Sequence, residues 1–125
     1  MAHEIFFGDG FVEAIYMGNV TYAERLSVLK ALAESKDAAI EVPLLINFLD
    51  AVLVDPDDQL NFMAHVMSQP EIQGRFIAMV GLSGEHARAA VLAAAALDAH
   101  LRVFNDRDQA LSWLGQRTQR FEVGA

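Results

Sequence analysis

Apolar and polar positions divide this chain into segments that predict strands and helices in turn. Short runs in which almost every residue is apolar or aromatic are typical of strands. These runs are Glu4–Phe7, Phe11–Met17, Leu44–Leu49, Phe76–Val80 and Leu101–Phe104. Between the later runs, apolar residues recur at the three- and four-residue spacing of an amphipathic helix. The predicted order of elements is therefore β-β-α-β-α-β-α-β-α.

The first two strands are predicted to form an antiparallel hairpin, because only Gly8, Asp9 and Gly10 separate them. Thr21 is the predicted N-cap of the first helix, and Glu24 three residues later completes a capping box. The stripe expected to be buried on this helix is Tyr22, Leu26, Leu29 and Ala33.

The third strand, Leu44–Leu49, is apolar at nearly every position except Asn47, which predicts a central strand covered by helices on both faces. Asp55 and Pro56 predict the start of the second helix, because Asp is a good N-cap and Pro suits the first helical position. We expect Pro70 to end this helix. Its predicted apolar face is Leu60, Met63, Ala64 and Met67.

The third helix, from about Glu85 to Ala99, is apolar almost all round and is therefore predicted to be largely buried. Asp106 caps the predicted last helix and Gly115 ends it, which leaves 116–125 as a loose tail. No repeat or linker divides the chain, so residues 1–125 are predicted to form a single domain. Its class is α/β, with a mostly parallel sheet of four to five strands, one antiparallel edge strand and four helices.

The composition narrows the classes of function. The chain has 125 residues, 54% of them hydrophobic, and no cysteine. The absence of cysteine excludes disulfides, thiolate catalysis and cysteine-ligated metals. The N-terminus has no signal-peptide pattern and no apolar run approaches the roughly 20 residues of a membrane span, so we expect a cytoplasmic protein.

The net charge of −8 argues against a nucleic-acid partner and against an anionic membrane surface. No Lys or Arg lies between Lys36 and Arg75. The carboxyl ends of the predicted parallel strands collect acidic residues, which are Asp50, Asp55, Asp57, Asp58, Glu85, Asp106 and Asp108. Such a rim either attracts a cation or a basic protein surface, or simply caps helix N-termini, and both interpretations fit these positions.

No catalytic motif is complete. The segment 81–85 resembles a nucleophile elbow around Ser83, but Glu85 stands where that motif needs glycine, and Ser83 fits a helix N-cap. A hydrolytic enzyme that uses Ser83 and His86 would need an acid to orient His86, and the sequence does not place one. A phosphoryl-accepting receiver domain would need a late lysine, yet the only lysines are Lys30 and Lys36. The histidines show no metal-ligand spacing; they are His3, His65, His86 and His100. We therefore predict a protein that is not an enzyme and uses no cofactor or metal.

The segment from Leu44 to Leu60, LLINFLDAVLVDPDDQL, resembles the central signature of STAS domains, the anti-sigma-factor-antagonist family. That signature is an apolar strand followed by Asp-Ser-Ser-Gly at the start of a helix. Asp55 aligns with its Asp, Pro56 with the serine that is phosphorylated in typical members, Asp57 with the next serine and Asp58 with the glycine. The ending VFNDRDQALSWL is similar to the closing strand and helix of the small SpoIIAA-like subfamily.

The resemblance implies a non-enzymatic regulatory module that docks a protein partner through the helix after this loop. The implied partner-binding residues are Asp55, Pro56, Asp57, Asp58, Gln59 and Asn61. Because Pro56 has no hydroxyl, a phosphorylation switch is not implied at that position.

SpoIIAA-like members are also similar to lipid-transfer domains, which gives an alternative, a carrier of a small apolar ligand. Its pocket residues would be Phe62, Met63, Phe76 and Trp113. A homodimer through the hairpin edge or an apolar helix face is also considered, because an unpaired strand edge invites pairing. The identity of the partner and the oligomeric state do not follow from the sequence.

Overall fold

The fold is described from a computed structural model. It covers residues 3–8, 10–34, 42–54, 58–70, 72–82 and 84–124, with the backbone alone for residue 33 and residues 117–124. The strands are β1 (His3–Phe7), β2 (Val12–Val20), β3 (Leu44–Leu53), β4 (Phe76–Val80) and β5 (His100–Phe104). The helices are α1 (Tyr22–Glu34), α2 (Gln59–Met67), α3 (Gly84–Ala96) and α4 (Arg107–Gly124).

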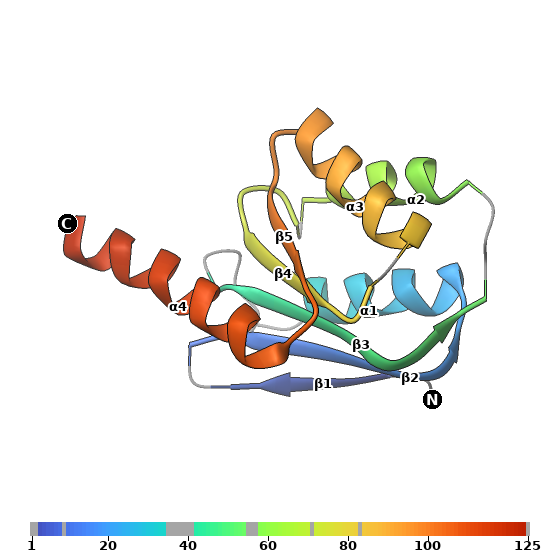
Figure 1. The fold of residues 1–125 in the computed structure, drawn as a ribbon, viewed down its shortest axis with the longest axis horizontal. Helices are drawn as coiled ribbons and strands as arrows, with labels where there is room; N and C mark the ends of the chain where they lie inside the picture. Colours follow the sequence, from blue (N-terminus) through green and yellow to red (C-terminus); the bar gives the residue numbers. More distant parts are fainter. Residues whose placement is uncertain are drawn as a thin grey trace.

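The strands form one sheet in the order β1-β2-β3-β4-β5 (Figure 1). β1 pairs with β2 in antiparallel register, with His3 opposite Tyr16, and the other pairs are parallel. The predicted order of elements and the mostly parallel sheet with one antiparallel edge strand are confirmed.

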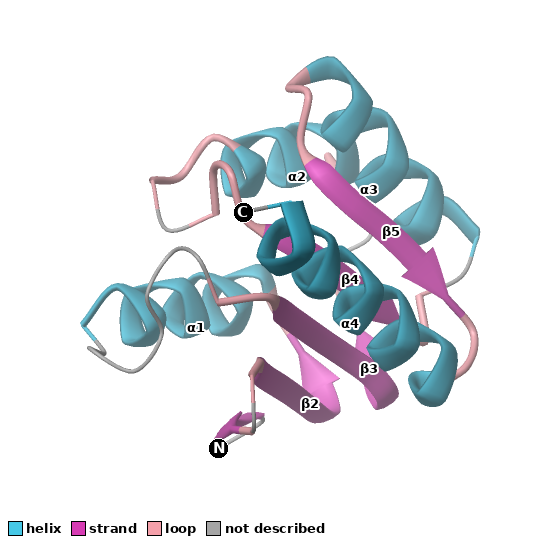
Figure 2. Cartoon of the chain, turned by 90° about the vertical axis from the view of Figure 1, so that its left-hand side faces the viewer, coloured by secondary structure: helices cyan, strands magenta, loops and turns pink. Residues whose placement is uncertain are grey.

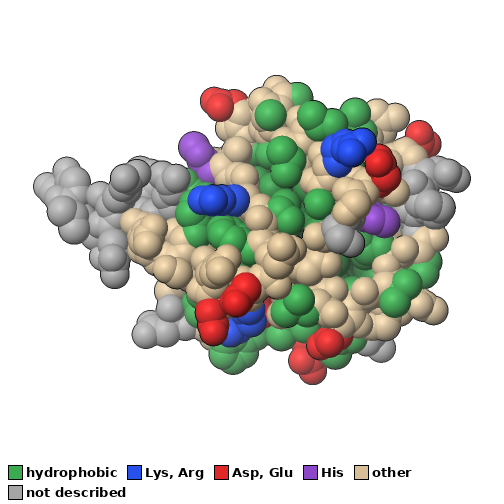
Figure 3. Space-filling view, viewed as in Figure 1, with side chains coloured by type: hydrophobic (Ala, Val, Ile, Leu, Met, Phe, Trp, Pro, Cys, Tyr) green, Lys and Arg blue, Asp and Glu red, His purple; other side chains and the backbone are tan. Residues whose placement is uncertain are grey.

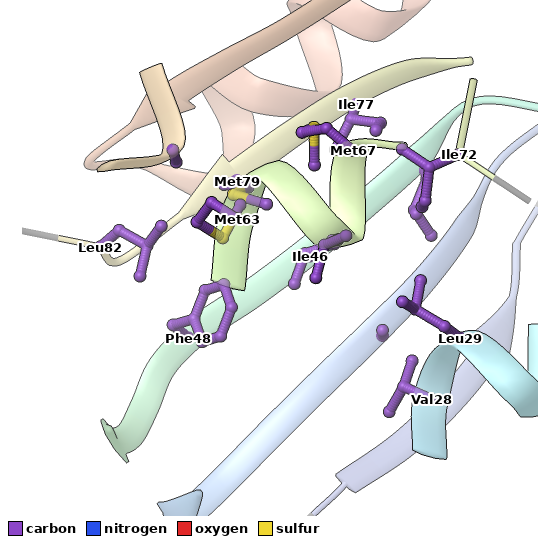
Figure 4. Close-up of a cluster of buried hydrophobic side chains, with 14 of the residues drawn as sticks. Val28, Leu29, Ile46, Phe48, Met63, Met67, Ile72, Ile77, Met79 and Leu82 are labelled. Carbon is purple, nitrogen blue, oxygen red and sulfur yellow. The ribbon is translucent and has the colours of Figure 1, made fainter. Parts of the chain in front are cut away.

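Three helices cover one face of the sheet and α4 covers the other (Figure 2). From β2 onwards, each connection leads from one parallel strand to its immediate neighbour, always toward the β5 edge of the sheet. Right-handed connections that all step the same way place their helices, α1 to α3, on the same face. α4 follows the last strand and returns across the opposite face. The two faces accordingly bury separate clusters, a large one under α1, α2 and α3 (Figure 4) and a smaller one under α4.

The strands β2 and β3 extend well beyond β4. Their pairing continues past an irregularity between Ile15 and Met17 as far as Val20 opposite Leu53, whereas β4 pairs with β3 only up to Asn47. Asp50, predicted to lie in a loop, is therefore a strand residue. Leu49 and Val52 on this extension are 50% and 58% exposed.

The buried faces of the helices differ from those predicted. On α1, Leu26 is exposed, and the buried residues that the prediction missed are Arg25, Val28 and Leu32. On α2, Leu60 is about half exposed. The prediction that the third helix is largely buried is wrong. Its contact with the sheet is a stripe of small residues, Ala89, Ala90, Ala93 and Ala94.

The helix α4 continues through Gly115 to Gly124. The prediction that Gly115 ends this helix is therefore wrong, and residues 116–124 are helical where a loose tail was predicted. One glycine inside a helix is unfavourable by only about 1 kcal/mol relative to alanine, and no proline follows it. The predicted cap is present, because Asp106 Oδ1 accepts hydrogen bonds from the Asp108 and Gln109 amides at 2.7 and 3.3 Å.

A buried ion pair ties α4 to the sheet. Glu13 on β2 is 1% exposed and faces Arg107 at the start of α4. Arg107 donates from Nε at 3.0 Å and from Nη2 at 2.6 Å to the two carboxylate oxygens, and Asn47 Nδ2 donates at 3.1 Å. Asn47, the polar residue inside the apolar third strand, is thus explained by its contact with a buried carboxylate.

Candidate functional site

The carboxyl ends of the parallel strands lead into the starts of α2 and α3, and these two helix starts lie side by side. The turn from β4 into α3 passes tightly against β3. A Cβ on Gly81, whose φ is +92°, would lie 2.7 Å from the Leu49 backbone nitrogen. Only glycine fits this approach without distortion. The ends of open parallel sheets are the usual place for a binding site.

Half of the predicted partner-binding residues lie at this edge. Asp55, Pro56 and Asp57 are outside the described residues. Asp58 is the N-cap of α2, which begins at Gln59 and not at Asp55 or Pro56 as predicted. Asn61 is exposed and Gln59 is half-buried on the first turn.

Asp58 adopts a left-handed backbone conformation, with φ 54° and ψ 34°. Few residues other than glycine, asparagine and aspartate tolerate this region. The resemblance aligns Asp58 with a glycine, and this backbone geometry explains why glycine would suit the position. The Asp58 carbonyl accepts a hydrogen bond from the Phe62 amide at 2.9 Å, but its carboxylate makes no capping hydrogen bond. The exposed carboxylate is therefore not needed to cap α2 and can meet a partner.

An open groove of about 400 Å³ lies between the starts of α2 and α3. Its walls are Asp58, Gln59, Leu60 and Asn61 on one side, and Glu85, Arg88, Ala89 and Leu92 on the other. Leu60 and Leu92 are about half exposed. Glu85 and Arg88 form an exposed ion pair at 3.4 Å. Hydrophobic side chains lie over this part of the molecule with acidic and basic groups beside them (Figure 3).

The four residues predicted for an apolar ligand pocket are not brought together. Phe62 and Met63 are buried in the cluster under α1, α2 and α3. Phe76 and Trp113 pack on the opposite face of the sheet, with ring centroids 6.2 Å apart. Neighbouring residues of β4 alternate between the two faces, so Phe76 points away from the α2 side. A single pocket between these four residues is therefore not formed.

Arg25 is a functional candidate that sequence reasoning missed. Its side chain, on the buried stripe of α1, is 7% exposed and contacts the sulfur of Met63 and the rings of Phe48 and Phe62. Burial lowers the pKa of Arg25 from its usual range. The available signal was its spacing, since Arg25 precedes Val28 and Leu29 by three and four residues and so shares their face.

The geometry gives no support to a histidine-assisted nucleophile. Ser83 lies outside the described residues. His86 Nε2 is buried and has no hydrogen-bond partner among the described residues. Burial, and to a lesser extent the charge of Arg25, lower the pKa of His86 from its usual range. The described residues also contain no group of three or more side chains placed to hold a metal ion.

No family model matches this chain, and no curated protein matches it in sequence. Among solved structures it is similar to an uncharacterized protein of the DUF3478 family from Shewanella loihica PV-4, described as having a SpoIIAA-like fold. The two sequences are 20% identical, the match covers 90% of this chain and 92% of that chain, and the TM-score is 0.58. The chain therefore has a SpoIIAA-like fold, as its resemblance to the STAS family implied. No helix among the described residues is long and apolar enough to cross a membrane.

Proposed function

We propose that this chain, with its SpoIIAA-like fold, is a non-catalytic docking module that binds a protein partner in the groove between α2 and α3. The observation that carries the proposal is the exposed carboxylate of Asp58, which makes no capping hydrogen bond, at the rim of that groove. An acid at a helix start is usually explained by capping. That explanation fails for Asp58, whose side chain makes no capping hydrogen bond.

The groove favours a partner surface that presents a basic side chain beside an apolar one. Asp58 and Glu85 supply two carboxylates, and Arg88 already pairs with Glu85. Asp58 is thus the acid that a partner cation would meet. Leu60 and Leu92 supply apolar surface on the opposite walls. Docked interfaces commonly combine an apolar centre with charged groups at the rim, where charge directs the approach.

The mode of action differs from a phosphorylation switch. In the resemblance to STAS domains, Pro56 occupies the position of the phosphorylated serine and offers no hydroxyl. We propose that Asp58 provides a permanent charge at the helix start, so that binding does not depend on a kinase.

The test is affinity capture from a lysate of the source organism, followed by a binding titration of the captured protein with purified variants. Asp58→Arg reverses the charge at the groove. Asp108→Arg makes the same change at the start of α4, where Asp108 is exposed, and serves as the matched control. We expect Asp58→Arg to weaken binding at least about tenfold and Asp108→Arg to leave it within about twofold.

Asp58→Asn separates charge from backbone effects, because asparagine also tolerates the left-handed conformation. Its binding should fall between wild type and Asp58→Arg. Equal losses in Asp58→Arg and Asp108→Arg would show that net charge alone drives binding. No loss in Asp58→Arg would place the partner surface elsewhere on the domain.

We also propose that the free edge of β1 is where self-association would occur. β1 is the last strand of the sheet on its side, and Phe6 and Phe7 are 54% and 45% exposed. An exposed apolar edge strand is a common template for pairing with a second chain. Light scattering of wild type and Phe6→Lys tests this, since a dimer through β1 should dissociate in the variant.

A further inference from the structure

Arg25 is a buried cation without an anionic partner in the described part of the chain. Among the described residues, its side chain donates from Nη2 to the Met63 sulfur at 3.2 Å, and a thioether is a weak acceptor. The guanidinium carbon lies 4.7 Å from the centre of the Phe62 ring and 5.2 Å from that of Phe48. Cation–π contacts offset part of the lost hydration of the guanidinium.

Arg25 lines a small cavity whose walls are mostly apolar. The cavity has a volume of about 20 Å³ and lies between α1, α2 and the sheet. Arg25 is its only charged wall residue among those described, and Tyr16 is the other polar one. The remaining walls are aliphatic or aromatic and include Val28 and Leu29 on α1, Ile46 on β3 and Val66 on α2. Figure 4 shows Val28 and Leu29 separated from Ile46 across this part of the sheet.

The seam between α1 and α2 is closed by side chains. The two helices lie apart over the same face of the sheet (Figure 2). The rings of Tyr22 on α1 and Phe62 on α2 stack across the seam, with centroids 4.0 Å apart and an angle of 9°. The Phe62 ring also contacts Arg25, so this stacked pair lies directly beside the guanidinium.

We propose that Arg25 binds the carboxylate of an amphiphilic monocarboxylate, such as a fatty acid, whose hydrocarbon chain lies between α1 and α2 on the sheet. A planar carboxylate matches the paired donors of one guanidinium. A phosphate would carry more charge and need more donors than the walls of this cavity supply. The apolar walls favour a hydrocarbon chain attached to the anion.

The present cavity holds about one water molecule, so the chain must enlarge it by parting the α1–α2 seam. The residues of this site and those of the docking groove do not overlap, although α2 contributes to both. The two proposals can therefore be tested independently.

The probe for the test is sodium decanoate, with decanol and acetate as the matched neutral and chainless compounds. Calorimetry and NMR shift mapping of wild-type protein should show decanoate binding at least about tenfold tighter than either compound, since a charge-assisted pair is added to apolar burial. Shifts should centre on Tyr16, Val28 and Val66. Arg25→Met should lose decanoate binding at least about tenfold, whereas Arg88→Met, an exposed control, should keep it.

His86 provides a second readout. The charge of Arg25 is the electrostatic influence that lowers the pKa of His86 besides burial. Decanoate bound to Arg25 should therefore raise the pKa of His86 in wild type, and have little effect in Arg25→Met.

Equal affinity for decanoate and decanol would overturn the proposal, because the cation would then contribute nothing. Absence of decanoate binding, or shifts confined to the α4 face around Trp113, would overturn it as well. The wild-type comparison of decanoate with decanol decides the question even if Arg25→Met does not fold.

Discussion

Arg107→Met tests the ion pair that joins α4 to the sheet. The change leaves the Glu13 carboxylate, 1% exposed, with Asn47 as its remaining hydrogen-bond donor. Removing one partner of a buried pair typically destabilises a protein by about 3–5 kcal/mol. The Arg107 side chain is 39% exposed, so water can partly replace it and screens the pair. We therefore expect the free energy of unfolding to fall by about 2–3 kcal/mol near pH 7.

The pH dependence provides a sharper criterion. Burial raises the pKa of Glu13, but hydrogen bonds from Arg107 and Asn47 and the charge of Arg107 outweigh it, so the net pKa is lowered. A carboxyl whose pKa is lower in the folded state stabilises the fold above its unfolded pKa, and this contribution disappears as the pH falls through the folded pKa. In Arg107→Met the desolvated carboxyl should instead have a raised pKa and take up a proton on folding. The destabilisation should therefore shrink between about pH 7 and about pH 4.

The assay is urea unfolding followed by Trp113 fluorescence and by circular dichroism. Arg88→Met, which removes an exposed ion pair, is the matched control and should change stability by less than about 1 kcal/mol. Adding Glu13→Gln to Arg107→Met should recover part of the loss, because no charge then remains buried. A loss below about 0.5 kcal/mol, or one that grows at low pH, would refute the reasoning.

Three further changes test other features by the same unfolding measurement. Gly81→Ala should destabilise the fold by more than about 2 kcal/mol, since its Cβ would meet the β3 backbone at a positive φ; a smaller loss would mean that this turn can shift. Thr21→Ala should remove the hydrogen bond from the Glu24 amide to Thr21 Oγ1 and lower stability by about 1 kcal/mol, while an unchanged midpoint would show that the cap is redundant. Arg25→Met should leave stability unchanged or raise it in the absence of ligand, because a charge without an anionic partner is replaced by an apolar chain of similar size; a large loss would assign Arg25 a structural role.

The architecture was predictable because strong local signals agree with it. The glycine-containing turn after Phe7 and the continuous apolar runs at Leu44 and Phe76 identify strands, and the residues between them have helical spacing. Element ends were less predictable, because tertiary packing decides them. Asp50 belongs to a strand because β2 continues alongside it, and Gly115 lies inside a helix because one glycine is too weak to stop it.

The functional candidates were predictable only in part. Asp58, Gln59 and Asn61, which the resemblance implied as partner-binding residues, line the groove. The predicted apolar pocket failed because hydrophobicity identifies burial but not which face of the sheet a residue covers. Phe76 and Met79 lie on the same strand yet on opposite faces. Arg25 and Glu13 were missed for a related reason, since charged residues are assumed to face water unless a partner distant in sequence is known.

The sequential strand order also bears on how the chain can assemble during synthesis. Each strand after the hairpin pairs with the strand made before it, so no later segment must insert between two that are already joined. Domains synthesised from the N-terminus can therefore add one strand and one helix at a time at a growing edge. Glu13 is the exception, because its partner Arg107 is translated 94 residues later. Until α4 emerges from the ribosome, one face of the nascent sheet is uncovered and the Glu13 carboxylate lacks its cationic partner. The docking of α4 is therefore the step that completes the domain.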